Sequence, residues 1–386
     1  MLRLLCKNLS QIRPFSVSTT PPPSLNGAHS RFPQNPGLKS ITHIANRSKE
    51  EDPSRTTVSY LVNSCGLSSE SALKASKRFR IISLENADSV LSLFKNRGFD
   101  QTQLDQMITR YPHLLTYDPD KILKPKMEFL KCQVGFSAVK LNELVSLNPQ
   151  FFNGSLEKRI KPSFDLLKDI VGTNENALLA ITRLPSILSL DLRKKMLPKV
   201  ALLREHGVPV SNISKLITRY SRIITVSDDR FSEVVAELKK MGFVPFRPLY
   251  LTALRTMSGM SNSNWERKFE VFKCLGLSED EILEFFKKFP YCMILSETKM
   301  RKGFEFFMKR LGWDPYMILR YPNLIGLSLE KRMLPRYEVM QTLLSNGLVE
   351  KDVNWGTIFK LKEKDFLKKF VIKYQGGSSK VKEMRI

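Results

Sequence analysis

The chain has 386 residues, of which 42% are hydrophobic, enough for one large core or for a long array of repeats that share a core. Its 62 Lys and Arg against 38 Asp and Glu give a formal charge of +24, which attracts polyanions or anionic membranes. Five widely separated cysteines without a C-x-x-C pair, and only four histidines, argue against a zinc, redox or histidine-based metal site.

Residues 1–48 are expected to be a mitochondrial transit peptide and disordered leader. The first 49 residues hold seven Lys or Arg and ten Ser or Thr but no acid, which is the composition of an organellar import signal. The sequence Arg13-Pro-Phe-Ser16 resembles the plant mitochondrial cleavage pattern and favours a cut after Phe15. Mitochondrial import is therefore preferred, with the chloroplast as the alternative.

The basic character does not come from the leader. Residues 50–386 keep 55 cations against 38 acids, so a charge of +17 belongs to the folded part. No apolar stretch reaches the roughly 18 residues that a membrane span needs, because charged residues and prolines break each candidate. The excess charge therefore calls for a polyanionic partner, and no membrane span is expected.

A glycine recurs at intervals of 32 to 37 residues, which is the signature of a solenoid built from one repeated helical unit. Each glycine ends a run with helical periodicity. It is expected in the left-handed conformation just after a long helix, with the next residue packing back against that helix. The series is Gly66, Gly98, Gly135, Gly172, Gly207, Gly242, Gly276, Gly312 and Gly347.

A shorter helix is expected after each glycine. Capping residues begin it, as Ser278 with Glu281 and Asp100 with Gln103 do, and a proline ends it. A buried apolar residue follows three positions later, and a second proline often comes thirteen positions after the first, where the first turn of the next long helix tolerates it. The first prolines are Pro112, Pro149, Pro185, Pro290 and Pro322, and the second prolines are Pro125, Pro162, Pro198 and Pro335.

Each unit therefore consists of a long helix, a glycine turn, a shorter helix and a proline-started turn, with no strand signal. We predict an all-α fold, an α-solenoid of about nine such repeats that forms a curved superhelix. The solenoid is expected over residues 57–375, followed by a basic flexible tail at residues 376–386.

The repeat resembles that of the mitochondrial transcription termination factor (mTERF) family, which combines the paired prolines, the apolar residue after the first and the closing glycine. Tetratricopeptide repeats have a different pattern, and pentatricopeptide repeats lack the proline pair. The resemblance covers roughly residues 57–375, including an ending, Leu361–Val371, similar to that of plant members. It departs in the repeat with Arg255 and Met257, which has no proline, and in the shortened repeat that ends at Pro322.

The resemblance implies binding of double-stranded DNA in the concave groove of a superhelix and a role in organellar transcription, including termination. Plant relatives also act in RNA processing, so RNA binding in intron splicing is an alternative. The implied partners are double-stranded DNA or RNA and the organellar transcription or splicing machinery, and a monomer is expected. A rival of another class is a protein-binding scaffold, against which the charge of +17 argues.

No catalytic site, metal site or cofactor is expected. The sequence has no P-loop, no G-x-G-x-x-G, no G-x-S-x-G and no H-E-x-x-H. Asp118-Pro-Asp120 superficially resembles a D-x-D metal motif, but it lies where the proline turn joins the next helix and is expected to form a turn and a cap. The sequence therefore favours a binding protein over an enzyme.

Two sets of cations recur once per repeat and are the candidate nucleic-acid-binding residues. The first, named here the short-helix column, lies two residues before the proline position. A cation in the last turn of a helix is favoured by the helix dipole by about 0.3 to 1 kcal/mol, so stability alone could explain this column. Aromatic residues beside it, such as Tyr220 and Tyr321, are expected in the core. The column comprises Arg78, Arg110, Arg183, Arg219, Arg255, Lys288 and Arg320, interrupted by Leu147.

The second set, the long-helix column, lies just before the second proline. These cations are near a helix N-terminus, where the dipole disfavours positive charge, so contact with nucleic acid is the preferred explanation. Pairs such as Glu157 with Lys161 could be ordinary bridges between residues four apart, which leaves solvated surface charge as the alternative. A cation repeated in every unit forms a line of charge that can follow a phosphate backbone. The column comprises Lys121, Lys124, Lys158, Arg159, Lys161, Arg193, Lys194, Lys195, Lys299, Arg301, Lys302, Lys331 and Arg332.

Overall fold

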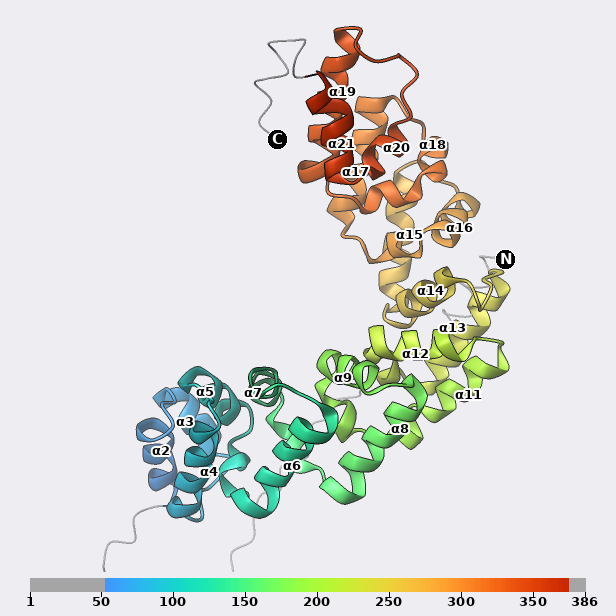
Figure 1. The fold of residues 1–386 in the computed structure, drawn as a ribbon. Helices are drawn as coiled ribbons and strands as arrows, with labels where there is room; N and C mark the ends of the chain where they lie inside the picture. Colours follow the sequence, from blue (N-terminus) through green and yellow to red (C-terminus); the bar gives the residue numbers. More distant parts are fainter. Residues whose placement is uncertain (1–52, 375–386) are drawn as a thin grey trace, which may run out of the picture.

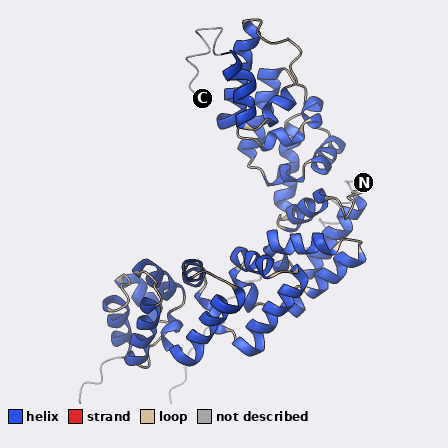
Figure 2. Cartoon of the chain, in the orientation of Figure 1, coloured by secondary structure: helices blue, strands red, loops and turns tan. Residues whose placement is uncertain are grey.

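The structure is a computed structural model that describes residues 53–374. Every regular element in this range is a helix, and Figure 2 shows no strand in the described chain. The prediction of an all-α helical-repeat solenoid is thereby confirmed. The expected transit peptide and basic tail lie outside the described residues.

Each repeat has a first helix, called long here, and a second helix, called short. The long helices are α2 (Pro53–Asn63), α4 (Leu84–Asn96), α6 (Lys124–Glu128), α8 (Lys161–Val171), α11 (Leu197–Glu205), α13 (Asp228–Lys240), α15 (Asn262–Cys274), α17 (Glu297–Leu311) and α19 (Leu334–Ser345). The short helices are α3 (Ser69–Ser76), α5 (Gln101–Arg110), α7 (Ala138–Leu147), α9 (Asn174–Arg183), α12 (Val210–Arg219), α14 (Pro248–Ser258), α16 (Glu279–Lys288), α18 (Pro315–Arg320) and α20 (Trp355–Lys360). Nine pairs within residues 53–374 match the expected number of repeats.

Shorter helical segments join these pairs. Single 3-10 turns follow six of the short helices, at Pro112–Thr116, Pro149–Asn153, Pro185–Ser189, Ser221–Thr225, Pro290–Ile294 and Pro322–Gly326. Turns of π-helix lie at Pro119–Leu123, Phe129–Val134, Leu156–Ile160, Leu329–Met333 and Leu367–Val371. The remaining segments are α10 (Leu192–Lys195), α21 (Glu363–Phe366) and a last 3-10 turn, Ile372–Tyr374. The long helix of the third repeat is α6 together with the π-helical turns on either side of it, and α10 leads directly into α11.

The repeats stack into a bent array with two arms that meet near α13 and α14 (Figure 1). In the N-terminal arm, the short helices α5, α7, α9 and α12 follow the inner side of the bend, and the long helices α6, α8 and α11 follow the outer side (Figure 1). The C-terminal ends of successive short helices therefore form a row along the array.

All nine glycines of the series have a positive φ, as predicted, with Gly135 at 95° and Gly172 at 88°. After Gly135 the amide of Phe136 donates to the carbonyl of Leu130 over 3.1 Å, and the Phe136 side chain is buried. The chain thus reverses after each long helix at a residue that needs no Cβ, and the following residue anchors the turn.

The second prolines lie at the second position of α6, α8, α11 and α19, as expected. In three of these repeats a π-helical turn precedes the proline, begun by a capping side chain at Asp118, Ser155 or Ser328. The amide of Ile160, for example, reaches the carbonyl of Ser155 over 3.0 Å. In these repeats the long-helix column therefore lies in the roughly two helical turns between the cap, seven residues before the proline, and the proline itself. Lys299, Arg301 and Lys302 lie in the first two turns of α17, which has no such proline.

Both repeats expected to be irregular differ from the others. In the shortened repeat that ends at Pro322, α18 has only six residues. The other is the repeat that contains α14. Helix α14 has no proline at its end and passes into α15 through Gly259, Met260 and Ser261 without a 3-10 turn. Arg230 of α13 spans the junction and donates to the carbonyls of Met257 and Met260 over 3.3 and 3.4 Å. By contrast, Ser221 replaces the proline after α12 and the 3-10 turn persists.

The core is continuous along the array because each repeat packs its apolar residues against the next. One cluster of buried side chains runs from Tyr60 to Phe359. A smaller cluster joins α19 to the C-terminal segment through Met340, Phe366 and Phe370. This arrangement is that of a solenoid, in which stability comes from contacts between neighbouring units.

Candidate nucleic-acid interface

The cations of the short-helix column lie at or near the C-terminal ends of the short helices. Arg110, Arg183, Arg219, Lys288 and Arg320 are the last residues of α5, α9, α12, α16 and α18. Arg255 lies in the last turn of α14, and Arg78 follows α3 by two residues. Successive repeats therefore present a cation at the same position, where it also opposes the partial negative charge of a helix C-terminus.

Two arginines of this column bind the repeat that follows. The guanidinium of Arg110 donates to the carbonyl of Leu147 over 2.5 Å, and that of Arg183 donates to the carbonyl of Thr218 over 2.6 Å. Each acceptor is a carbonyl in the last turn of the next short helix, which has no partner inside its own helix. These arginines therefore join neighbouring repeats while remaining exposed.

Arg255 is held by two tyrosines from the repeats on either side. Its guanidinium lies 4.4 Å from the ring centre of Tyr220 and 5.6 Å from that of Tyr291, and it donates to the Tyr291 hydroxyl over 2.7 Å. Burial raises the pKa of Tyr220, and Tyr291 raises it further through its hydroxyl. Tyr220 is half-buried, so the prediction of a core position holds only in part.

A cavity lies where α9, α12 and α14 meet, and four arginines line it. We name it the arginine pocket. Its volume is about 290 Å³, and the residues around it are Arg183, Arg219, Tyr220, Ser221, Arg222, Ile223, Val226, Arg255 and Gly259. None of these described residues is acidic, and within residues 53–374 none of the four arginines is in an ion pair.

The column is less uniform toward the C-terminus. Lys288 forms an ion pair with Glu284 at 3.1 Å, four residues earlier in the same helix. Arg320 has only a weak contact, 3.9 Å from its Nη1 to the sulfur of Met317. Lys360, the last residue of α20, lies 5.5 Å from the ring centre of Tyr321 and continues the column by one more repeat.

The long-helix column is divided among three environments. Five of its lysines have carboxylate neighbours within the turn or in the next repeat: Lys121–Asp118 at 3.9 Å, Lys124–Asp120, Lys161–Glu157 at 2.6 Å, Lys194–Asp191 at 4.0 Å and Lys302–Glu330 at 3.8 Å. Two others bind carbonyls: Lys299 donates to Gly326 over 2.7 Å and Arg332 to Leu361 over 2.6 Å. The other six make no side-chain bond within residues 53–374: Lys158, Arg159, Arg193, Lys195, Arg301 and Lys331.

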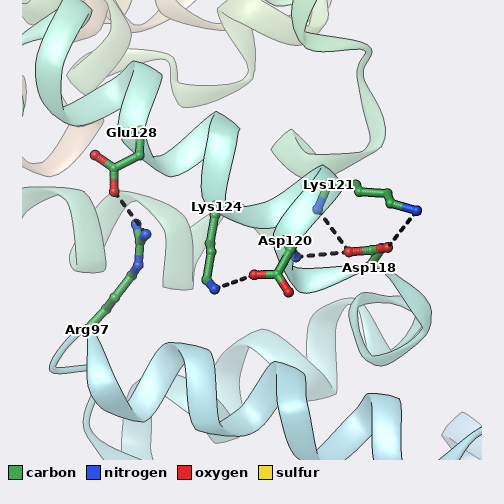
Figure 3. A network of polar contacts seen from close by, with 6 residues as sticks. All are labelled: Arg97, Asp118, Asp120, Lys121, Lys124 and Glu128. Atoms are coloured by element: carbon green, nitrogen blue, oxygen red, sulfur yellow. Dashed lines mark hydrogen bonds and ion pairs between the residues drawn. The ribbon is translucent and has the colours of Figure 1, made fainter.

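Figure 3 shows the first of these turns, where Asp118 pairs with Lys121 and Asp120 pairs with Lys124. The Asp118 carboxylate accepts the backbone amides of Asp120 and Lys121 over 2.9 and 2.8 Å, and the bond from Lys121 is the main reason that its pKa is lowered. Asp118 is therefore a helix cap, as predicted. Exposed ion pairs such as Lys124–Asp120 contribute about 0 to 1 kcal/mol, so these lysines lose little of their capacity to bind an anion.

The mTERF family model matches residues 44–169 and 164–367 of the chain. The chain belongs to the mTERF family. It is similar to transcription termination factor MTERF8, chloroplastic, of Arabidopsis thaliana, with 23% identity over 241 residues, 62% of this chain and 48% of that protein. It is also similar to transcription termination factor MTERF15, mitochondrial, of the same plant, with 29% identity over 175 residues, 42% of this chain and 38% of that protein. The chain thus spans less than half the length of each of these relatives.

A third recurring set of mTERF cations was missed at the sequence level, because it is buried. Lys126 donates to the carbonyl of Phe152 over 2.5 Å, and Lys199 forms an ion pair with Asp228. Arg336 donates to the carbonyls of Ile358, Phe359 and Leu361 over 2.9, 3.2 and 2.8 Å and to Glu363 over 2.6 Å. The signal was a cation directly after the second proline: Pro125-Lys126, Pro198-Lys199 and Pro335-Arg336.

These buried cations, which we call clamp residues, stabilise the contacts between neighbouring repeats. Lys268 of α15 occupies the same environment and donates to the carbonyl of Leu295. Burial lowers the pKa of Lys126 and of Lys268, since the charged form is poorly solvated there. Each clamp residue holds a carbonyl or carboxylate of the next repeat, so recurrence of a cation in the sequence is not by itself a sign of a ligand.

Two further observations concern other kinds of site. Among residues 53–374, no group of three or more His, Cys, Asp or Glu side chains is arranged to hold a metal ion. In the same range, no helix combines the length and the apolar character that crossing a membrane requires.

Proposed function

We propose that this mTERF chain binds double-stranded DNA in the mitochondrion and regulates transcription there, including termination. Both relatives bear the name of transcription termination factors, one of a chloroplast and one of a mitochondrion, which supports an organellar nucleic-acid-binding regulator. The acid-free, basic composition of the first 49 residues favours the mitochondrion.

One observation carries the proposal of an interface. Three arginines of the short-helix column, Arg110, Arg183 and Arg255, are held by carbonyls, a hydroxyl and aromatic rings rather than by carboxylates, so their positive charge is not neutralised. These three are ordered by neighbours in the adjoining repeats, which reduces the entropy lost on binding. A row of fixed, uncompensated guanidinium groups is suited to the regularly spaced phosphates of a nucleic acid.

The two columns would act together. A 3-10 turn of five residues joins the end of each of six short helices to the segment that leads into the next long helix, so both columns lie along the turn edge of the array. The short-helix column supplies Arg110, Arg183, Arg219 and Arg255, and the long-helix column supplies the unpaired Arg193 and its neighbours. Contacts of this kind fix the protein on the backbone, and a protein fixed at many phosphates obstructs a polymerase that moves along the same duplex.

The test is equilibrium binding of the full chain to a labelled duplex across a salt series. Replacing Arg78, Arg320 and Lys360 with Gln should weaken binding and reduce the slope of log K against log salt by about 0.9 for each cation that touches a phosphate of the duplex. The matched control replaces Lys74, Lys240 and Lys309, which pair with acids on exposed helix faces, with Gln. Equal losses in both variants would show that only total charge matters and would refute the column.

Single-stranded and structured RNA in the same assay test the identity of the nucleic acid. We expect the duplex DNA to bind most tightly. Tighter binding of RNA would replace transcription with RNA processing as the function. Absence of binding to any nucleic acid would leave the scaffold interpretation.

A further inference from the structure

The arginine pocket differs from the rest of the short-helix column in the concentration of its charge. Elsewhere each repeat presents at most one cation of this column, whereas here Arg183, Arg219, Arg222 and Arg255 from three successive repeats line one cavity of about 290 Å³. Arg222 is in the 3-10 turn Ser221–Thr225 and belongs to neither predicted column. The volume is at the lower end of the range of ligand pockets, so the group bound must be small.

Four guanidinium groups are more than an internal phosphodiester requires. A phosphodiester within a strand carries one negative charge, and successive phosphates are spread along the strand. A phosphomonoester carries about 1.5 to 2 negative charges near neutral pH and offers three acceptor oxygens. Since none of the described lining residues is acidic, the pocket matches a highly charged phosphate group better than a single link of a backbone.

The four arginines also divide into fixed and free members. Arg183 is fixed by its bond to the Thr218 carbonyl, and Arg255 by Tyr220 and Tyr291. A guanidinium has five N–H donors, so one that bonds a carbonyl keeps donors for a ligand. Arg219 and Arg222 are exposed and make no side-chain bond within residues 53–374, which leaves both able to turn toward a ligand.

The remaining lining residues provide a partly apolar wall. Ile223 is buried and Val226 half-buried, and the Tyr220 ring stands beside Arg255. Such a wall accommodates the sugar or base next to a phosphate and keeps water from competing with the arginines. The pocket therefore has a charged part for phosphate oxygens and an apolar part for the group that bears them.

We propose that the arginine pocket binds a terminal or oligophosphate group, the 5′-phosphate end of a nucleic acid strand or the phosphate chain of a free nucleotide, in preference to an internal phosphodiester. The inference goes beyond the proposed function, because the proposed ligand of this pocket is a terminal phosphate group and not the internal phosphates of a continuous duplex. It would let the protein distinguish a nucleic acid by the chemistry of its terminus.

The test compares three otherwise identical oligonucleotides that carry a 5′-triphosphate, a 5′-monophosphate or a 5′-hydroxyl group, bound to the full chain. We expect the phosphorylated ends to bind at least about tenfold more tightly than the hydroxyl end, the effect of an added charge-assisted hydrogen bond. The double variant Arg219→Gln, Arg222→Gln should reduce this ratio to about 1 while circular dichroism remains helical.

The matched control removes two cations outside the pocket, Arg320→Gln and Lys360→Gln. It should weaken binding of all three oligonucleotides and leave their ratio unchanged. Competition by ATP distinguishes the two sources of the phosphate group: displacement of the 5′-phosphorylated strand by ATP indicates a free nucleotide as ligand, and resistance to ATP indicates a strand end.

The outcomes separate this inference from the proposed function. A ratio near 1 in the unchanged protein, with strong binding of all oligonucleotides and no effect of ATP, overturns the terminal-phosphate site and leaves the backbone interface intact. A ratio that persists in the double variant also overturns it. Binding of ATP alone, with no affinity for any strand, supports the pocket and overturns the proposed function instead.

Discussion

The short-helix column and the buried clamp residues are both sets of cations that recur with the period of the array, and members of both sets bind the repeat that follows. Arg183 reaches a carbonyl 35 residues ahead and stays exposed, whereas Lys126 reaches a carbonyl 26 residues ahead and is buried. The two kinds of cation differ in whether the charge is still accessible to a ligand after the bond is made. A buried cation can only stabilise the fold, whereas an exposed cation can also attract a phosphate.

Several cations of the long-helix column also stabilise the fold. The column lies near helix N-termini, where the helix dipole disfavours positive charge, so from the sequence a nucleic-acid ligand is the preferred explanation for its cations. In the structure Lys299 and Arg332 stabilise the next repeat instead, and Lys124 and Lys161 pair with acids one turn earlier. A cation that does not stabilise its own helix therefore need not bind a ligand, because it can stabilise the next repeat instead.

The largest expected effect comes from a clamp residue. Arg336 is 2% exposed and its guanidinium binds three carbonyls and one carboxylate, so Arg336→Met should lower the free energy of unfolding by about 3 to 5 kcal/mol. Urea denaturation measures it. Lys309→Met, which removes an exposed pair with Glu305, should cost less than about 1 kcal/mol. Similar losses in the two variants would contradict the distinction between clamp and surface cations.

An intermediate effect is expected within the short-helix column. Arg183→Gln should lower the free energy of unfolding by about 1 to 2 kcal/mol, because the Thr218 carbonyl loses its bond, and should also weaken binding to duplex DNA. Arg219→Gln removes the same charge without removing a bond and should weaken binding alone. Thermal melts and binding isotherms of both variants decide whether Arg183 has two roles.

A smaller effect on stability is expected in the long-helix column. Replacing Lys158, Arg193 and Lys195 with Gln should leave the melting temperature nearly unchanged and reduce the salt slope of DNA binding by about 2 to 3, if all three touch phosphates. Arg332 is best left in place, because its loss would free the Leu361 carbonyl. An unchanged slope would assign these cations to solvated surface and leave the short-helix column as the interface.

The smallest effect concerns a contact within a single repeat, the capping box of Ser278 and Glu281. The backbone amide of Ser278 donates to the Glu281 carboxylate over 2.8 Å. This hydrogen bond is the main cause of the lowered pKa of Glu281. A lowered pKa contributes stability above the unfolded value of about 4.3 that is lost as pH falls through the folded value. The difference in melting temperature between the unchanged protein and Glu281→Ala should therefore be small at pH 7 and vanish in acid.

The local part of the fold could be predicted from the sequence. Positive φ at Gly135 and its counterparts, the caps at Asp100 and Ser278, and the proline-started 3-10 turns depend on neighbours within about six residues, and all were confirmed. The stacking of repeats could be predicted as well, since one unit repeated in sequence buries one continuous core.

The roles of the cations that bridge repeats could not be predicted, because their partners lie 22 to 37 residues away. The proline before Lys126 marks a recurring cation but does not show that the side chain is buried, and Arg222 gave no periodic signal although it lines the arginine pocket. Lys360 was missed because no proline follows it. Side chains that bridge repeats are selected by the register of stacking, which a local pattern does not contain.

The clamps all connect a repeat to its immediate neighbour, so a pull along the array would load them in series. A molecular motor that moves along bound DNA would exert such a pull, and the array would yield first at its weakest joint. The resistance of the whole array to force would then be set by one junction rather than by the sum of its repeats.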